Sequence, residues 1–189
     1  VDLNETPITR IEGNAILTGT IRCEVDAIVL ATGFDAMTGA VMNIDIRGKN
    51  GLSLQDKWAT GPKAYLGLAT AGFPNLFLVT GPGSPSVLSN MLPSIEQHVE
   101  WIASCIEFMD RHQHRSIDPD RDAEEAWIEH VNEVADTSVY PGCNSWYLGA
   151  NVEGKSRVFM PYLGVPPYVE KCNEVVAAGY AGFKLSGTS

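Results

Sequence analysis

A turn of small residues, Gly81-Pro82-Gly83-Ser84-Pro85-Ser86, follows an apolar run from Leu76 to Val79 and precedes a long amphipathic stretch. Glycine lets a backbone approach a ligand that a Cβ atom would keep away. A helix N-terminus offers free N–H groups and partial positive charge, which favour an anion or an electron-rich ring edge. The pattern therefore fits a ligand-binding turn at the end of a strand, where open α/β sheets bind their ligands. A plain tight connection between strand and helix explains it equally well.

The turn completes none of the common signatures of nucleotide binding or nucleophilic catalysis. The sequence contains no G-x-G-x-x-G and no G-x-x-x-x-G-K-[ST], so no phosphate-binding fingerprint is complete. The turn also does not match a G-x-S-x-G nucleophile elbow, and no base for a nucleophilic serine is evident.

Three other groups of residues are expected to have structural or solvent-exposed roles rather than catalytic or metal-binding ones. His112 and His114 would lie about 200° apart around a helix and have no third ligand, so no metal site is predicted. His98, one turn into the same helix, is expected to be a structural hydrogen-bonding residue rather than a catalytic base. The acidic residues of the next helix are expected to form a solvated face; they are Glu124, Glu125, Glu129 and Glu133.

Composition limits the classes of partner and compartment. The net charge of -10 over 189 residues argues against binding to nucleic acid or an anionic membrane, since both require a basic face. No apolar run approaches the roughly 18 residues of a membrane span, and no signal peptide is visible. The four cysteines are far apart and form no C-x-x-C motif. We therefore expect reduced thiols and a cytoplasmic protein.

The elements that position the turn are predicted from periodicity and read as an α/β fold. Continuous apolar runs predict buried strands at 26–32 and 76–80. Apolar residues at helical spacing predict helices at 93–113, 119–136 and 169–178. Pro93 fits a first helical position, and Ser94 with Gln97 resembles a capping box. Gly13-Asn14 predicts a hairpin turn, and the segment GFKL predicts a final strand.

Two long segments resemble a known family. Residues 26–101, including ATAGFPNLFLVTGPGSPSVLSNMLPSIEQHVEW, and residues 143–164, CNSWYLGANVEGKSRVFMPYLG, are similar to the C-terminal half of a Baeyer–Villiger monooxygenase. These enzymes are class B flavoprotein monooxygenases of the phenylacetone and cyclohexanone monooxygenase group. The resemblance implies the C-terminal fragment of a flavoprotein with two Rossmann-like dinucleotide-binding domains. It assigns residues 1–34 to the end of the NADPH-binding domain and the crossover, and residues 35–189 to the C-terminal part of the FAD-binding and substrate domain.

The resemblance also implies an activity and a set of site residues. Such an enzyme uses FAD, NADPH and O2, and its C4a-peroxyflavin converts a ketone to an ester or lactone. The implied cofactor-binding residues are Gly81, Pro82 and Gly83 beside the FAD, Asn90 and Met91 near the flavin pyrimidine edge, and Trp146 over NADP. The implied ketone-pocket residues are Ser86, Val87, Leu88, Met91 and Met160, with Phe159 as an alternative to Met160. For these positions core packing, loop surface or, at Trp146, a buried anchor under the loop remains the other interpretation.

Other family signatures are missing from this sequence. Both glycine-rich nucleotide fingerprints, the F-x-G-x-x-x-H-x-x-x-W-P signature and the upstream active-site arginine and aspartate are absent. Arg47, Lys57, Lys63 and Lys155 match no such motif and are expected to be solvated. We therefore expect a fragment, or the product of a truncated gene, that alone neither oxygenates ketones nor binds FAD tightly.

Two further expectations follow from a missing half. The alternative function is a non-catalytic binding or interaction protein, a truncated remnant of the family. Strands that were central in a parent sheet would have unpaired edges and uncovered faces, which the chain is expected to hide by self-association, by strand exchange or by a local refold. The identity of the ketone and the oligomeric state do not follow from the sequence.

Overall fold

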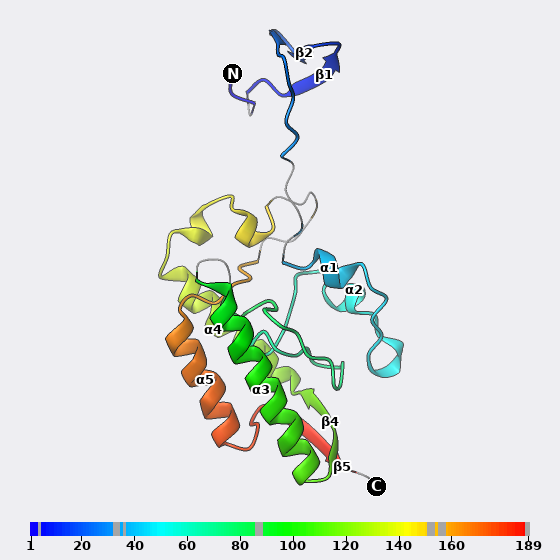
Figure 1. Cartoon of the computed structure of the whole chain (residues 1–189), viewed down its shortest axis with the longest axis vertical. Coiled ribbons are helices and arrows are strands. Elements are labelled where there is room, and N and C mark those ends of the chain that lie inside the picture. Colours follow the sequence, from blue (N-terminus) through cyan, green and yellow to red (C-terminus); the bar gives the residue numbers. More distant parts are fainter. Residues whose placement is uncertain are drawn as a thin grey trace. The chain divides into compact units, whose positions relative to one another are not determined.

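The computed structural model describes residues 1–3, 5–31, 35, 37–85, 89–150, 154 and 158–187. The chain divides into two compact units, Val1–Gly33 and Phe34–Ser189, and each is described by itself (Figure 1). The assignment of these two parts to the NADPH-binding and FAD-binding domains stays a prediction.

The first unit is built on a three-stranded antiparallel sheet of β1 (Ile8–Glu12), β2 (Ala15–Thr18) and β3 (Arg22–Glu24), in the order β1-β2-β3. The hairpin predicted at Gly13-Asn14 is confirmed, because Glu12 pairs with Ala15 across that turn. Gly13 has a φ of 56°, a left-handed conformation that glycine adopts without steric cost.

The strand predicted at 26–32 is wrong over the residues that the structure describes. Residues 26–31 pair with no strand there and are exposed, with Val29 at 87% and Leu30 at 76%. An apolar run becomes a strand only where neighbouring strands accept its hydrogen bonds, and the described part of this chain offers it none.

Three helices form the frame of the second unit: α3 (Met91–Arg111), α4 (Arg121–Asp136) and α5 (Val165–Ala177). They confirm the predicted helices at 93–113, 119–136 and 169–178, with α5 beginning four residues earlier than expected. Figure 1 shows α3 in green beside α5 in orange, and the two helices are in contact. No helix among the described residues is both long enough and apolar enough to cross a membrane.

The start of α3 differs from the prediction. Asn90 is the N-cap, and its side chain accepts a hydrogen bond from the Leu92 amide at 3.1 Å. Pro93 is therefore the third helical residue rather than the first. The capping box of Ser94 and Gln97 is wrong, because Ser94 lies buried inside the first turn and its Oγ has no partner among the described residues.

A two-stranded antiparallel sheet closes the other end of the helices. β4 (His114–Pro119) pairs with β5 (Phe183–Gly187), with Ile117 opposite Leu185. The predicted final strand is thus confirmed, whereas β4 was not predicted. The main core lies between the three helices and this sheet and includes Trp101, Cys105, Ile117, Trp127, Val131, Tyr168, Cys172 and Tyr180.

Short elements precede α3 and follow α4. They are α1 (Gly39–Met42), η1 (Lys49–Gly51), α2 (Leu54–Lys57), η2 (Tyr140–Gly142) and η3 (Trp146–Leu148). A second, smaller core consists of Leu54, Trp58, Ala64, Phe73 and Leu78. The strand predicted at 76–80 is wrong, since that segment forms only an isolated bridge between Phe77 and Ala69. From an irregular backbone, Phe77 packs against the main core and Leu76 and Leu78 pack in the second core, whereas Val79 is 44% exposed.

Candidate functional site

The turn that follows residue 80 is packed inside the protein. Gly81, Pro82, Gly83, Ser84 and Pro85 are all buried. A Cβ atom at Gly81 would lie 2.5 Å from the Gly67 carbonyl oxygen and 2.9 Å from Leu78 Cβ. The missing side chain at Gly81 therefore has an explanation inside this chain, namely close contact with another backbone segment.

Gly83 is held on two sides. Its N–H donates to the Met160 carbonyl, and its own carbonyl accepts from Trp127 Nε1 at 3.1 Å. Its φ is 87°, and a Cβ atom would lie 3.0 Å from Trp127 Nε1. Both backbone conformation and space thus require glycine at this position.

Segments far apart in the sequence run side by side here. Tyr162 N–H donates to the Ser84 carbonyl at 2.9 Å, and Pro85 forms a parallel bridge with Tyr162. The contact between Gly83 and Met160 belongs to the same pairing of segments. It joins a residue that the resemblance assigned to the cofactor, Gly83, with one that it assigned to the substrate pocket, Met160. Met160 is 2% exposed and Phe159 is 8% exposed, so both contribute to the interior.

His98 links the turn to α5, which confirms its predicted structural role. Its Nδ1 accepts a hydrogen bond from the Thr80 amide at 2.9 Å, and its Nε2 lies 2.9 Å from the Tyr168 hydroxyl. Because the amide can only donate, Nδ1 is the unprotonated nitrogen and Nε2 carries the hydrogen. Burial lowers the pKa of His98 to about 4.

The remaining predicted site residues lie at the edges of this region. Asn90 is exposed at the α3 N-cap, and Met91 is half-buried. Trp146 is half-buried, stacks on Tyr147 with ring centroids 4.2 Å apart, and packs against the main core. Contact of these residues with a cofactor or ketone stays a prediction. Ser86, Val87 and Leu88 lie outside the described residues, as does Lys155.

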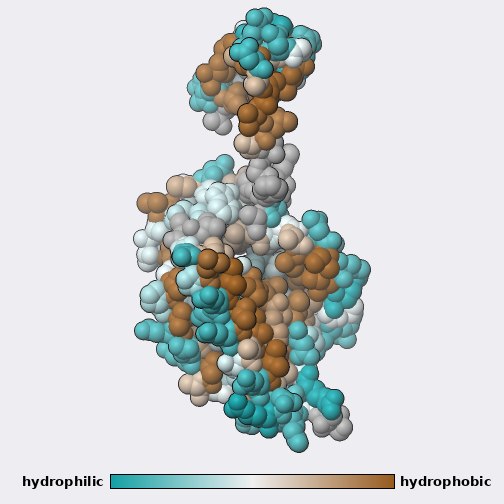
Figure 2. All heavy atoms as spheres, in the orientation of Figure 1, coloured by the Kyte–Doolittle hydropathy of each residue, from teal (hydrophilic) through white to brown (hydrophobic). Residues whose placement is uncertain are grey.

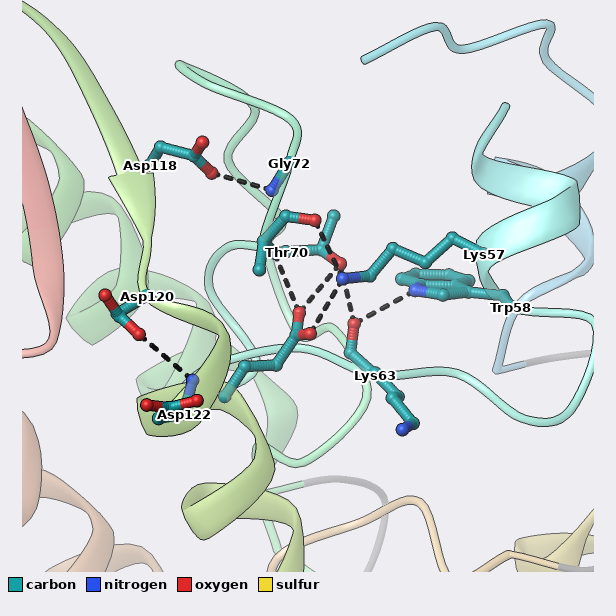
Figure 3. A network of polar contacts seen from close by, with 10 residues as sticks. Lys57, Trp58, Lys63, Thr70, Gly72, Asp118, Asp120 and Asp122 are labelled. Atoms are coloured by element: carbon teal, nitrogen blue, oxygen red, sulfur yellow. Dashed lines mark hydrogen bonds and ion pairs between the residues drawn. The ribbon is translucent and has the colours of Figure 1, made fainter. Parts of the chain in front are cut away.

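A buried polar network was missed by the sequence analysis (Figure 3). Glu124, predicted to be solvated, is 1% exposed and accepts hydrogen bonds from three groups: Lys57 Nζ at 2.7 Å, Thr70 Oγ1 at 3.0 Å and the Ala71 amide at 2.8 Å. The Lys57 side chain, also predicted to be solvated, is only 13% exposed because it pairs with this carboxylate. The prediction was wrong because Glu124 lies on the same helix face as Trp127 and Val131.

Asp118 extends this network at the end of β4. Its Oδ1 accepts from the Gly72 amide at 2.8 Å, and its Oδ2 pairs with Lys49 at 2.7 Å. A pocket of about 560 Å³ opens beside these groups, lined by residues that include Lys49, Lys57, Asp118 and Glu124. The carboxylates therefore fasten the loop at 63–72 to β4 and α4, and every charge of the network that is buried has an opposite charge beside it.

Two observations bear on metal and thiol chemistry. Within the described ranges no group of three or more His, Cys, Asp or Glu side chains could hold a metal ion. The four cysteines are free; Cys105 and Cys172 are buried, and burial raises the pKa of Cys105 to about 12 and of Cys172 to about 11. Those two thiols are consequently protonated and poor nucleophiles at neutral pH.

Comparison with known proteins finds curated relatives but no family model. No protein-family model matches the chain. An acetone monooxygenase (methyl acetate-forming) of Gordonia sp. (strain TY-5) is 42% identical over 188 residues, which is 97% of this chain and 35% of the relative. The chain thus spans about a third of the length of the curated relatives that it matches.

Solved structures agree. A cyclohexanone monooxygenase from Rhodococcus sp. Phi1 bound to NADP+ has a TM-score of 0.91 and 39% identity, covering 100% of this chain and 35% of that one. A structure of OTEMO in complex with FAD and NADP has a TM-score of 0.86 and 35% identity, covering 98% of this chain and 34% of that one. The helices and small sheets therefore match part of a larger protein.

Proposed function

Because this chain belongs to the Baeyer–Villiger monooxygenase family and resembles the C-terminal part of such a flavoprotein, we propose that it forms part of an FAD- and NADPH-dependent enzyme that converts ketones to esters or lactones with O2. The observation that carries the proposal is similarity at about 40% identity over nearly the whole chain to enzymes whose names state ketone oxygenation. Residues 1–34 would belong to the NADPH-binding domain and residues 35–189 to the FAD and substrate domain.

The described residues fit a flavin at the start of α3 better than at the glycines. The space beside Gly81 and Gly83 is filled by Gly67 and Trp127 of the chain itself. In contrast, the N-terminus of the 21-residue helix α3 ends in exposed Asn90 and half-buried Met91. The partial positive charge of such a terminus suits the electron-rich edge of a flavin ring. The glycines would then act indirectly, by fixing the backbone that leads to this terminus.

A bound flavin would supply the oxygen-transfer chemistry, and the residues of this chain would shape its surroundings. The α3 terminus would orient the ring edge, and Met91 would keep water away from one side of the ketone pocket. Met160, which is 2% exposed, would support this side from the interior. Trp146 would cover NADP. The four cysteines are free, which fits a reducing compartment, so we propose that the enzyme is cytoplasmic.

A chimera tests this function. The chain would replace the C-terminal third of the Gordonia acetone monooxygenase, and ketone-dependent NADPH oxidation and ester formation would be measured. We expect a yellow, active chimera, whereas the 189-residue chain alone stays colourless and inactive. The unmodified Gordonia enzyme is the control. Turnover by the chain alone, or a folded chimera that binds flavin and forms no ester, would count against the proposal.

One observation favours the alternative of a non-catalytic interaction protein. A stripe of apolar residues on the outer face of α3 is exposed, with Leu92 at 68%, Val99 at 52% and Ile106 at 53%. Figure 2 shows hydrophobic residues running along this helix. Self-association through this face is a proposal that the chain alone can test.

A further inference from the structure

Two strained turns meet in the second unit. Leu66 has a φ of 56° and is followed by Gly67, and Thr80 has a φ of 55° and is followed by Gly81. A left-handed conformation is uncommon for a residue with a side chain, and for a β-branched residue such as Thr80 it is a clear outlier. Such residues persist only where the surrounding structure holds them.

The two turns touch through their backbones. A Cβ atom at Gly81 would lie 2.5 Å from the Gly67 carbonyl oxygen, and one at Gly67 would lie 2.9 Å from the Gly81 carbonyl oxygen. The Gly81 carbonyl also accepts hydrogen bonds from the Ser84 amide at 3.1 Å and the Ser84 hydroxyl at 2.7 Å. The position of one turn therefore fixes the other, and through Ser84 it fixes the start of the segment that runs beside Met160.

One pair of buried side chains bridges both strained residues. His98 is 0% exposed and accepts the Thr80 amide at Nδ1, while its Nε2–H donates to the Tyr168 hydroxyl. Tyr168 is 1% exposed and donates its own hydrogen to the Leu66 carbonyl at 2.8 Å. A continuous chain of hydrogen bonds thus runs from Thr80 through two rings to Leu66.

We propose that His98 is a positioning residue that acts with Tyr168 to hold the Leu66–Gly67 and Thr80–Gly81 turns against one another. This contact between the turns in turn fixes the position of Gly83 and of the segment, starting at Ser84, that runs beside Met160. Only the identity of the group that this arrangement serves, the flavin and its ketone, rests on the proposed function. A histidine suits the task because a rigid ring carries an acceptor on one side and a donor on the other. The lowered pKa of His98 agrees with this, since a neutral ring is needed for Nδ1 to accept.

Substitutions separate the two halves of the bridge. His98→Asn keeps an acceptor near the Nδ1 position and does not reach Tyr168. His98→Leu removes both contacts, and Tyr168→Phe removes only the link from His98 to Leu66. Ser94→Ala is the matched control, because Ser94 is buried on the same helix and its Oγ has no partner in the part of the chain that the structure describes.

Nuclear magnetic resonance of the full 189-residue chain at pH 7 reads the outcome. In the wild-type chain we expect an unprotonated Nδ1 on His98 and slow hydrogen exchange of the Thr80 amide. Exchange at Thr80 should become about tenfold faster in His98→Leu and return to within about twofold of wild type in His98→Asn. In Tyr168→Phe the resonances of Leu66 and Gly67 should move while Thr80 stays protected.

Three results would overturn the proposal: a protonated Nδ1 in the wild-type chain, equal Thr80 exchange in His98→Asn and His98→Leu, or shifts spread evenly over the core. The first needs no variant, so an unfolded His98→Leu chain does not stop the test.

The active chimera gives an independent reading of what the bridge serves. His98→Leu should lower the fraction of NADPH oxidation that yields ester, and His98→Asn should recover most of it. An inactive chimera would sink the proposed function, while the resonance measurements on the chain would still decide whether His98 positions the turns. If the fraction of NADPH oxidation that yields ester stays unchanged in a chimera carrying His98→Leu, the bridge does not serve the flavin.

Discussion

Glu124 is a buried carboxylate whose three partner groups come from two other backbone segments. It belongs to α4, whereas Lys57 belongs to α2 and Thr70 and Ala71 belong to the loop before residue 72. A buried ion pair of this kind contributes little net stability. Removing one of its two charges is costly, because the charge that remains has lost both its contact with water and its partner.

Glu124→Gln should therefore lower the free energy of unfolding by about 3 kcal/mol. The glutamine has the same shape, but it leaves the ammonium of Lys57, whose side chain is 13% exposed, without its counter-charge. Urea unfolding followed by circular dichroism would measure the change. Glu125→Gln is the control, since Glu125 is exposed on the same helix and should change stability by less than about 0.5 kcal/mol. Equal effects of the two variants would contradict the assignment.

His98 should make stability depend on pH. Its pKa in the folded chain is about 4, below the ordinary value of 6.5, because burial penalises the charged ring. Between these values the unfolded chain binds a proton that the folded chain does not, so stability rises with pH across the window and is lost as pH falls from 6.5 towards 4. The contribution is on the order of 3 kcal/mol.

Urea unfolding at several pH values would test this for wild type and His98→Asn. The carboxylates titrate in both proteins, so the difference in slope isolates the histidine. Identical slopes between pH 4 and 6.5 would show that His98 is not held neutral in the folded state.

For His98 and Glu124, the sequence could indicate burial but not the partners of the buried side chain. His98 was predicted correctly because position 98 shares a helix face with the buried Ser94, Trp101 and Cys105. Glu124 carried the same signal, since it lies three residues before Trp127 and seven before Val131, but its charge was given more weight than its position. The partners of both residues lie on distant loops, and no periodicity in one sequence predicts those.

At the scale of elements, α3 begins with a cap that differs from the predicted one. Asn90→Ala should cost about 1 kcal/mol, because it removes the acceptor of the Leu92 amide. Ser94→Ala should be neutral or stabilising, since its buried Oγ has no partner within the described ranges. Thermal unfolding of the two variants would decide between the caps, and a larger loss in Ser94→Ala would restore the capping box.

The buried turn offers a purely steric prediction. Gly81→Ala should destabilise the fold by about 2 kcal/mol, because the added methyl meets the Gly67 backbone at 2.5 Å and backbone cannot move aside cheaply. Gly142→Ala is the control, as no atom of the described residues beyond its chain neighbours lies within 4 Å of the Cβ position there. A tolerated Gly81→Ala, judged by urea unfolding, would mean that an external group rather than the chain requires glycine at that position.

The three long helices predicted from this sequence formed, whereas the two strands predicted as buried did not, for a physical reason. A helix satisfies its hydrogen bonds within itself, so the apolar spacing in α3 and α4 was sufficient. A strand needs a partner, so the apolar residues at 26–31 and 76–80 did not become strands, whereas the polar segment His114–Pro119 did because β5 lies beside it. The site residues Gly83 and Met160 were assigned from family resemblance, and their contact depends on a bridge between distant loops.

For the whole molecule, charge and exposed apolar surface oppose each other. The chain carries a net charge of -10, which keeps copies apart at low ionic strength. The exposed α3 stripe consists of Leu92, Val99 and Ile106, with the half-buried Ile95 and Ile102 between them, and is bordered by exposed acidic residues. Burying this stripe against a second copy would gain apolar contact while bringing Glu96, Glu100 and Glu107 of each copy together.

Self-association should therefore increase with salt. Screening at 1 M ionic strength shortens the range of acidic repulsion to about 3 Å, while apolar contact is retained. Light scattering of the chain from low to high salt should show a rise in mean mass, and Val99→Lys with Ile106→Lys should abolish it because both positions are more than half exposed in the free chain. Glu125→Lys on exposed α4 surface is the control for a change of charge alone. A monomer at every salt concentration would show that this face stays solvated in the isolated chain, and association that falls with salt would show that charge pairing rather than the apolar stripe drives it.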